Sequence, residues 1–187
     1  TEDWTVDNIE SYSYANNKKA VVKPFGYREV EIESGVRSIG SYSFNGCSKL
    51  TEIKFVEESN FKYENGMILT KDDTELISYL QTNTETDFIF LPDELETIRP
   101  YAFSGNTYLE MIVIPMNVKT IENNAFKDCT KLTHVYYMGL TSPTMGNDVF
   151  LNTKVLSPFM YKKVCHYKYK KLDEELLNEA CQFFLGE

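Results

Sequence analysis

Few side chains in this 187-residue sequence could perform acid–base or nucleophilic chemistry, and their spacing is unfavourable. His166 directly follows Cys165, and adjacent residues rarely converge on one reaction centre, so a Cys–His dyad is not expected. His134 occupies a position that two other copies of an internal repeat fill with Glu52 and Met111. Carboxylates are scattered, and no Gly-x-Ser-x-Gly, phosphate-binding-loop or His-Glu-x-x-His sequence occurs. We therefore expect a protein without enzyme activity and without catalytic residues.

The cysteines and acids are equally poor candidates for a metal or cofactor site. No Cys-x-x-Cys pair and no Cys/His spacing suited to zinc is present. Asp72 and Asp73 could contact calcium, but two acids in a turn are more often solvated turn formers. For Cys165 and Cys181, a disulfide in an oxidising compartment is an alternative to two free thiols. No metal and no cofactor are expected.

An apolar phrase that occurs three times predicts the elements of the fold. Starting from Ile or Leu, it places apolar residues at +4, +7, +12, +18 and +21, and Cys or Asn at +15. The copies begin at Ile32, Leu91 and Ile114, and we call the step from Leu91 to Ile114 the repeat interval. An interval of this length, about 23 residues, is typical of a solenoid, in which repeats stack and bury a shared core.

Two positions of the phrase predict buried columns. The phenylalanines at +12 should stack in the core, and the small residues at +15 should pack or hydrogen-bond inside a turn. The first column contains Phe44, Phe103 and Phe126, and the second contains Cys47, Asn106 and Cys129.

Period-two alternation at the end of each copy predicts a half-buried strand, so stacked copies would form a parallel sheet. Its solvent-facing side chains are the candidate partner-binding residues: Glu52, Lys54, Met111, Val113, His134 and Tyr136. The last four would form a partly apolar patch, and exposed apolar clusters often mark partner sites. Shielding of these side chains by the insertion described next, or by a neighbouring chain, is the alternative. A second short strand in each repeat would expose two further rows, Arg37/Glu96/Lys119 and Ser38/Thr97/Thr120.

The unit between the first and second copies is longer than the others. Asn65-Gly66 lies between apolar runs, and this is a strong hairpin signal because both residues tolerate positive φ. We expect residues 55–90 to form an irregular unit with a β-hairpin that projects from the stack.

The expected organisation is one repeat array with a cap at each end. Residues 1–29 would form capping strands around a turn at 16–19, and residues 30–153 would form the repeats. Residues 154–187 would add a last strand and a helical cap, with helices over 159–171 and after Asp173. Solenoids need such caps because an exposed terminal repeat leaves apolar surface and strand edges uncovered.

The net charge of −9 is unfavourable for binding nucleic acid or anionic membrane. No apolar stretch is long enough to span a membrane. A lysine cluster near the C-terminus fits either a solvated helix face or a patch for an acidic partner; its members are Lys162, Lys163, Lys168, Lys170 and Lys171.

The phrase Ile-Pro-x2-Val-x2-Ile-x3-Ala-Phe-x2-Cys-x2-Leu, which starts at Ile114-Pro115, resembles the BspA-type leucine-rich repeat. The run from Phe61 to Leu69 resembles the unit that alternates with full repeats in such proteins. The resemblance covers about residues 20–171 and implies a mainly β leucine-rich-repeat solenoid with a helical C-terminal segment. In the first copy, Glu33 stands where the phrase has proline and Ser43 where it has alanine.

This resemblance implies a surface or secreted protein of a host-associated organism, commonly linked to adhesion. The first functional hypothesis is therefore a non-enzymatic, adhesin-like module that binds host or matrix proteins. The alternative is a structural spacer of a larger surface protein, with no ligand of its own. An apolar exposed ladder would favour the first hypothesis, and an evenly charged ladder the second.

Overall fold

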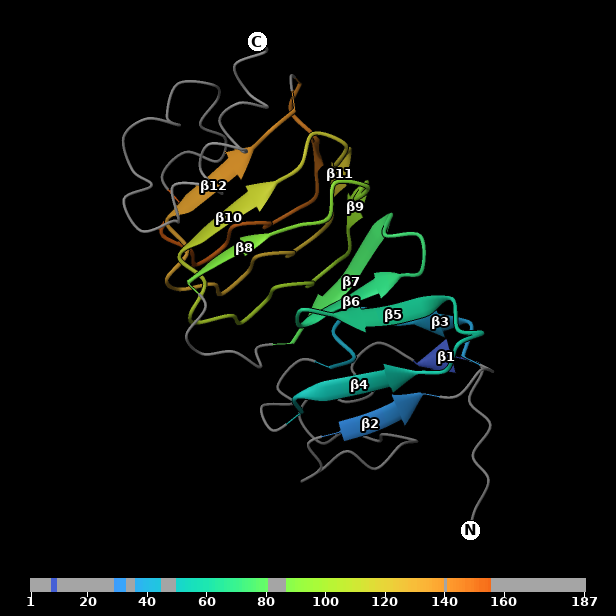
Figure 1. Cartoon of the computed structure of the whole chain (residues 1–187). Coiled ribbons are helices and arrows are strands. Elements are labelled where there is room, and N and C mark those ends of the chain that lie inside the picture. The colour runs from blue at the N-terminus through green and yellow to red at the C-terminus, as the bar shows by residue number, and fades with distance from the viewer. Residues whose placement is uncertain are drawn as a thin grey trace, which may run out of the picture.

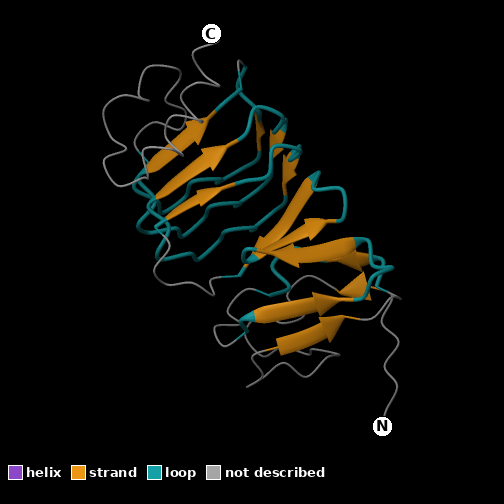
Figure 2. Ribbon diagram, viewed as in Figure 1, coloured by secondary structure: helices purple, strands orange, loops and turns teal. Residues whose placement is uncertain are grey.

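A computed structural model describes residues 8–9, 29–32, 36–44, 50–80, 87–139 and 141–155 of the chain. Within these ranges the protein consists of β-strands joined by turns (Figures 1 and 2). The strands are β1 (Asn8–Ile9), β2 (Glu29–Ile32), β3 (Ser38–Ile39), β4 (Glu52–Phe55), β5 (Phe61–Glu64), β6 (Met67–Thr70), β7 (Glu75–Tyr79), β8 (Phe88–Phe90), β9 (Thr97–Ile98), β10 (Met111–Ile114), β11 (Thr120–Ile121), β12 (His134–Tyr137) and β13 (Thr144–Met145). The predicted mainly β solenoid is confirmed.

The longer strand of each repeat stacks in parallel on its neighbour. β10 lies between β8 and β12, and Met111 is opposite both Phe88 and His134, which lie one repeat interval before and after it. β2 pairs with β4 in a separate two-stranded sheet. The predicted repeat register therefore holds, and the structure adds β8, which begins one repeat interval before β10.

The short second strands form another sheet, whose order is β13-β11-β9-β7-β6-β5. β13, β11, β9 and β7 are parallel, whereas β6 and β5 continue the sheet antiparallel. β1 pairs in parallel with β3, so Asn8–Ile9 covers the edge of the first repeat's short strand. The other residues predicted to form caps, 1–7, 10–28 and 156–187, lie outside the described ranges, together with the predicted helices, the lysine cluster, Cys165, His166 and Cys181.

The insertion does not project from the stack, so that prediction is wrong. β5, β6 and β7 form a wall between two apolar cores, as Figure 1 shows near its centre. On β6, Ile68 belongs to the N-terminal core, whereas Met67 and Leu69 belong to the C-terminal core. On β7, Ile77 and Leu76 divide in the same way. Apolar residues on both faces of these strands require burial on both sides, which a projecting hairpin could not provide.

The hairpin turn itself is the predicted one. Asn65 and Gly66 adopt φ values of 50° and 83°, as a tight turn between antiparallel strands requires. A Cβ at Gly66 would lie 2.9 Å from Cε2 of Tyr79 and 3.2 Å from the Leu80 carbonyl oxygen. Both the positive φ and the lack of space for a Cβ therefore favour glycine at this position.

The aromatic column is confirmed for Phe103 and Phe126, whose rings stack with centroids 4.9 Å apart. Phe150 continues the column on one side at 5.3 Å, and Tyr79 of β7 continues it on the other at 5.3 Å. Phe44 is buried in the N-terminal core, so its predicted place in the same column is wrong. The wall formed by the insertion separates it from Phe103, and Tyr79 occupies the adjacent position.

The turns that carry these rings stack through backbone hydrogen bonds and use left-handed residues at two matched positions. The first position is filled by Tyr101, Asn124 and Asp148 and the second by Gly105, Asp128 and Asn152, all with φ between 54° and 78°. Asn, Asp and Gly tolerate this region best, which explains why polar residues recur there. Tyr42 and Tyr101 adopt it despite their size, and their rings are in contact with centroids 4.8 Å apart.

The residue at +15 of the phrase lies inside these turns, as predicted. The Asn106 side-chain oxygen accepts hydrogen bonds from the backbone N–H groups of Tyr108 and Leu109, both at 2.9 Å. The Cys129 thiol donates to the Phe103 carbonyl oxygen at 3.1 Å. Burial raises the pKa of this thiol to about 12, so Cys129 is a structural residue and not a nucleophile. Cys47 lies outside the described residues.

Candidate binding surface on the main sheet

The six candidate residues do not form one continuous ladder, which corrects the prediction. Glu52 and Lys54 lie on β4, in the sheet that β4 forms with β2. The other four lie on β10 and β12, in the sheet that also contains β8. The insertion separates the two sheets, because its strands occupy the space between the first full repeat and the second (Figure 1).

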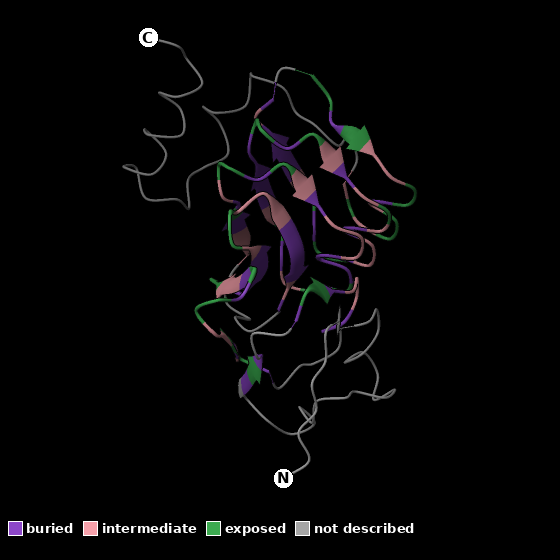
Figure 3. Cartoon of the chain, turned by 90° about the vertical axis from the view of Figure 1, so that its right-hand side faces the viewer, coloured by how far each residue is buried: buried purple, intermediate pink, exposed green. Residues whose placement is uncertain are grey.

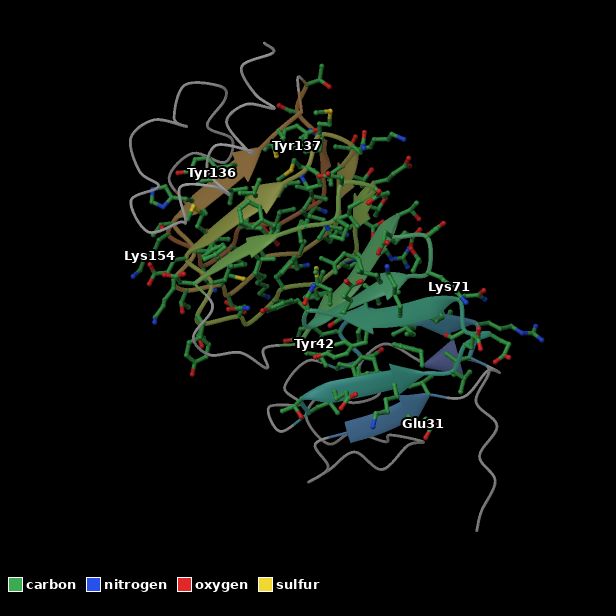
Figure 4. The ribbon with its side chains drawn as sticks, in the orientation of Figure 1. Glu31, Tyr42, Lys71, Tyr136, Tyr137 and Lys154 are labelled. Carbon is green, nitrogen blue, oxygen red and sulfur yellow. The ribbon has the colours of Figure 1, made fainter. Side chains whose placement is uncertain are left out.

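The two sheets differ in chemistry. On β4, the Lys54 ammonium lies 3.9 Å from the Glu52 carboxylate, and both side chains are about half exposed, at 54% and 47%. Glu31 of β2 is exposed in the same sheet. Figure 4 labels Glu31 at the end of the molecule away from Tyr136. The β2–β4 surface is therefore polar and carries partly compensated charges.

The sheet β8-β10-β12 carries an outward surface without a charged carboxylate or ammonium group. We call it the apolar face and define it by Phe88, Phe90, Met111, Val113, His134 and Tyr136, which occupy matched positions in three adjacent strands. Phe88 and Phe90 were not among the predicted site residues. They could have been found by counting one repeat interval back from Met111 and Val113.

The intervening residues of these strands point into the core, so alternation sorts the two sets. Ile112 and Ile114 are fully buried, and the Tyr137 hydroxyl donates to the Val118 carbonyl oxygen at 2.8 Å. Figure 4 labels Tyr136 and Tyr137 on opposite sides of β12. Gly139 makes room for the Tyr137 ring, since a Cβ there would lie 2.3 Å from it.

The expectation that the whole face is solvent-exposed is wrong for two of its members. Val113 is 9% exposed and Tyr136 is 7% exposed, whereas Phe90 is 37% exposed. Val113 lies between Phe90 and Tyr136 on strands about 4.8 Å away on either side, and these larger side chains shield it. The His134 and Tyr136 rings lie nearly parallel, with planes 11° apart and centroids 6.1 Å apart. The exposed part of the apolar face is thus centred on β8 and the start of β10.

The rings on this face are held by neighbouring groups. Phe88 and Phe90 make an edge-to-face contact, with centroids 5.7 Å apart and planes 81° apart. Nδ1 of His134 lies 2.8 Å from the Thr133 hydroxyl. Fixed rings lose little conformational entropy on association, which favours their use as contact residues.

The outer face of the six-stranded sheet is different again. Thr97, Thr120 and Thr144 form a row across β9, β11 and β13. Lys119 pairs with Glu96 at 2.8 Å, and Arg99 lies within 3.3 Å of Glu75 and 3.7 Å of Glu122. Figure 3 shows this side of the molecule, with its short strands half-buried to exposed. The predicted exposure of Arg37, Glu96 and Lys119 is confirmed. The charges of this face form ion pairs with one another, so the face offers little unpaired charge to a binding partner.

The two acids that could have contacted calcium serve their own turn. Oδ1 of Asp72 accepts from the backbone N–H and the hydroxyl of Thr74, and hydrogen bonds from threonines lower the pKa of Asp72. Asp73 pairs with Lys62 at 2.6 Å, and this hydrogen bond raises the pKa of Lys62. Within the described parts of the chain, no three His, Cys, Asp or Glu side chains are grouped so as to hold a metal ion.

No helix among the described residues has the length and apolar character needed to cross a membrane. The structure thus offers an apolar sheet surface as its candidate functional site, with neither a metal cluster nor a reactive thiol in the described ranges.

Comparison with known proteins agrees with this architecture. The chain matches a family model described as the BspA-type leucine-rich repeat region, in six copies, over residues 7–67 and 61–170. The pneumococcal vaccine antigen PcpA aligns with 22% sequence identity and a TM-score of 0.56, over 68% of this chain and 37% of PcpA. At this identity the likeness shows a shared fold alone.

Two further solved structures align less closely. A leucine-rich repeat protein from Eubacterium ventriosum has 17% identity and a TM-score of 0.42, over 73% of this chain and 61% of that one. A leucine-rich cell surface protein from Faecalibacterium prausnitzii has 27% identity and a TM-score of 0.38, over 72% and 30%. The chain therefore spans less than two thirds of the length of each of these three proteins. No curated protein sequence matches it.

Proposed function

Because the chain belongs to the BspA-type leucine-rich repeat family, we propose that it is a protein-interaction module of a cell-surface or secreted protein. Repeat solenoids present extended surfaces and generally act as binding scaffolds without catalysing reactions. The finer part of the proposal is an adhesin-like role, in which the partner is a host or matrix protein. PcpA, which shares the fold, is named as a vaccine antigen, and a surface location would suit this chain as well.

The observation that carries the proposal is the apolar face. Phe90 is one of three large apolar side chains that are more than a third exposed in the described ranges, and Met111 and Phe88 beside it are half-buried. Aromatic residues and methionine are enriched in protein interfaces, whereas charged residues are depleted from interface centres. The face therefore has the composition of an interface centre. Among the predicted site residues, Met111 and His134 remain the proposed contacts, with Phe88 and Phe90 added to them.

The test is binding of the immobilised chain to a panel of extracellular-matrix and serum proteins, with the Phe90→Asp/Met111→Glu variant in parallel. The substitutions place two carboxylates at the centre of the face, and truncation of interface anchors typically costs about 2 kcal/mol or more. We expect saturable binding to the wild type and binding at least about tenfold weaker to the variant. Surface plasmon resonance provides the measurement.

The matched control is Thr141→Asp/Thr144→Glu, which adds the same two charges at exposed positions outside the apolar face. It should bind as the wild type does, and circular dichroism should show all three proteins folded. Equal loss in both variants would point to a non-specific charge effect and contradict the assignment of the face.

One observation favours the spacer as a second candidate. The β2–β4 surface and the outer face of the six-stranded sheet carry charges that pair with one another, as a solvated structural segment would. Absence of saturable binding to every protein of the panel would favour this alternative.

A further inference from the structure

The apolar face is bordered by carboxylates at both ends of its strands. Asp87 and Glu110 immediately precede β8 and β10, and the backbone N–H groups of Glu110 and Met111 donate to the Asp87 carbonyl oxygen, which holds the two residues side by side. Asp93 and Glu94 lie beyond the other end of β8, where both are exposed. None of these four carboxylates forms an ion pair with another described residue.

Little positive charge compensates these groups. Lys131 and Lys154 are the described lysines near the start of these strands: the Lys131 ammonium group lies 5.5 Å from the centre of the Tyr108 ring, and the Lys154 backbone N–H donates to the Leu132 carbonyl oxygen. Four carboxylates against two ammonium groups leave an excess of negative charge around the face, in a chain whose net charge is −9. Some charges elsewhere on the described surface are paired, as at Lys119–Glu96 and Arg99–Glu122, whereas Glu31, Glu57 and Glu58 form no ion pair with another described residue. The four carboxylates beside the apolar surface are therefore available to basic groups of a partner.

The geometry points to a partner segment that combines a short apolar run with flanking lysine or arginine residues. We infer that this segment lies on the apolar face with its basic residues opposite the carboxylates at the two ends; this inference rests on the proposed function of the same face. Three strands span about 10 Å, and the four residues of β10 or β12 span about 13 Å, which suits a segment of about four residues in extended form. An acidic partner would meet like charges at both ends, which makes its binding unfavourable.

Charge complementarity of this kind acts mainly on association rate and specificity, and salt screens it. The apolar contacts should persist at high ionic strength, whereas the contribution of the carboxylates should fall. The affinity of the chain for such a segment should therefore fall as the salt concentration rises. Binding should require Phe90 and Met111 at every salt concentration.

The experiment selects a random peptide library on the immobilised chain and retains the peptides that are not enriched on Phe90→Asp/Met111→Glu. We expect these peptides to carry Lys or Arg on either side of an apolar run. A synthetic copy of the most enriched peptide is then measured against Glu94→Lys/Glu110→Lys, which reverses one charge at each end of the face. Affinity should fall by about tenfold and its salt dependence should flatten.

The matched control is Glu57→Lys/Glu58→Lys, which makes the same change of net charge at two exposed positions in the turn after β4. Its affinity for the peptide should equal that of the wild type. Enrichment of neutral or acidic peptides that still require Phe90 and Met111 would overturn the inference and leave the proposed function standing. Failure to enrich any peptide that depends on the apolar face would overturn both.

Discussion

At the scale of the residue, the aromatic column is the feature on which the repeat depends. The Phe126 side chain is fully buried and stacks between Phe103 and Phe150, so no neighbour can move far to fill the space it occupies. Truncation of a buried Phe removes its transfer free energy and leaves a cavity.

Phe126→Ala should therefore lower the free energy of unfolding by about 3–5 kcal/mol. Lys119→Ala removes a side chain that is 69% exposed and pairs with Glu96, and exposed pairs of this kind contribute about 0–1 kcal/mol. Urea unfolding followed by circular dichroism measures both changes. Equal small effects would contradict the repeat register.

Titration in the alkaline range tests the burial of Cys129. Its pKa rises from 9.0 to about 12 in the folded chain because burial disfavours the thiolate. Above pH 9 the unfolded chain loses this proton while the folded chain keeps it, so the free energy of unfolding should fall as pH rises. The raised pKa values of Tyr79 and Lys62, caused by burial and by the hydrogen bond to Asp73, act in the same direction at higher pH.

Urea unfolding at a series of pH values above and below 9 measures this decline, with Cys129→Ala as the comparison. The variant loses the titrating thiol, so its stability should depend less on pH just above 9. An identical pH dependence in both proteins would mean that the thiol contributes nothing to the decline.

At the scale of the element, the wall formed by β5, β6 and β7 divides the described part of the molecule into two apolar cores. Successive residues of β6 and β7 face opposite cores, so each strand stabilises both. Of the three strands, β7 is hydrogen-bonded to β9 of the six-stranded sheet, which links the wall most directly to the C-terminal core.

This division predicts that two neighbouring substitutions have different regional effects. Ile68→Ala should increase amide hydrogen exchange mainly at Ile53, in the N-terminal core, whereas Leu69→Ala should increase it mainly at Ile112, in the C-terminal core. Both side chains are fully buried, so each substitution should cost about 2–5 kcal/mol within its own core. Hydrogen-exchange mass spectrometry resolves the two regions. A uniform increase in both variants would show that the cores unfold as one unit.

At the scale of the whole molecule, the described surfaces differ in how their charges are arranged. The six-stranded sheet pairs its charges, the β2–β4 sheet carries a mixed polar surface, and the β8-β10-β12 sheet is apolar with carboxylates at its ends. This uneven distribution is what separates a candidate binding face from the rest of the solenoid, and the proposed binding experiments follow from it.

Features of the fold that depend on local spacing could be predicted from the amino-acid sequence. A fixed repeat interval specifies parallel strand stacking, and this interval predicted the register of β10 against β12 as well as the Phe103–Phe126 contact. The Asn65-Gly66 pair predicted its turn because backbone φ preference is a local property. The small residue at +15 was also predictable, since a tight turn restricts side-chain size.

The location of the insertion could not be predicted from the sequence, because it depends on contacts between distant segments. An apolar run such as that of β6 and β7 indicates burial, but it does not state whether one core or two will cover it. Once the insertion separates Phe44 from Phe103, it also separates Glu52 and Lys54 from the apolar face. The shielding of Val113 by its larger neighbours likewise depends on side chains from adjacent strands, which are distant in the sequence.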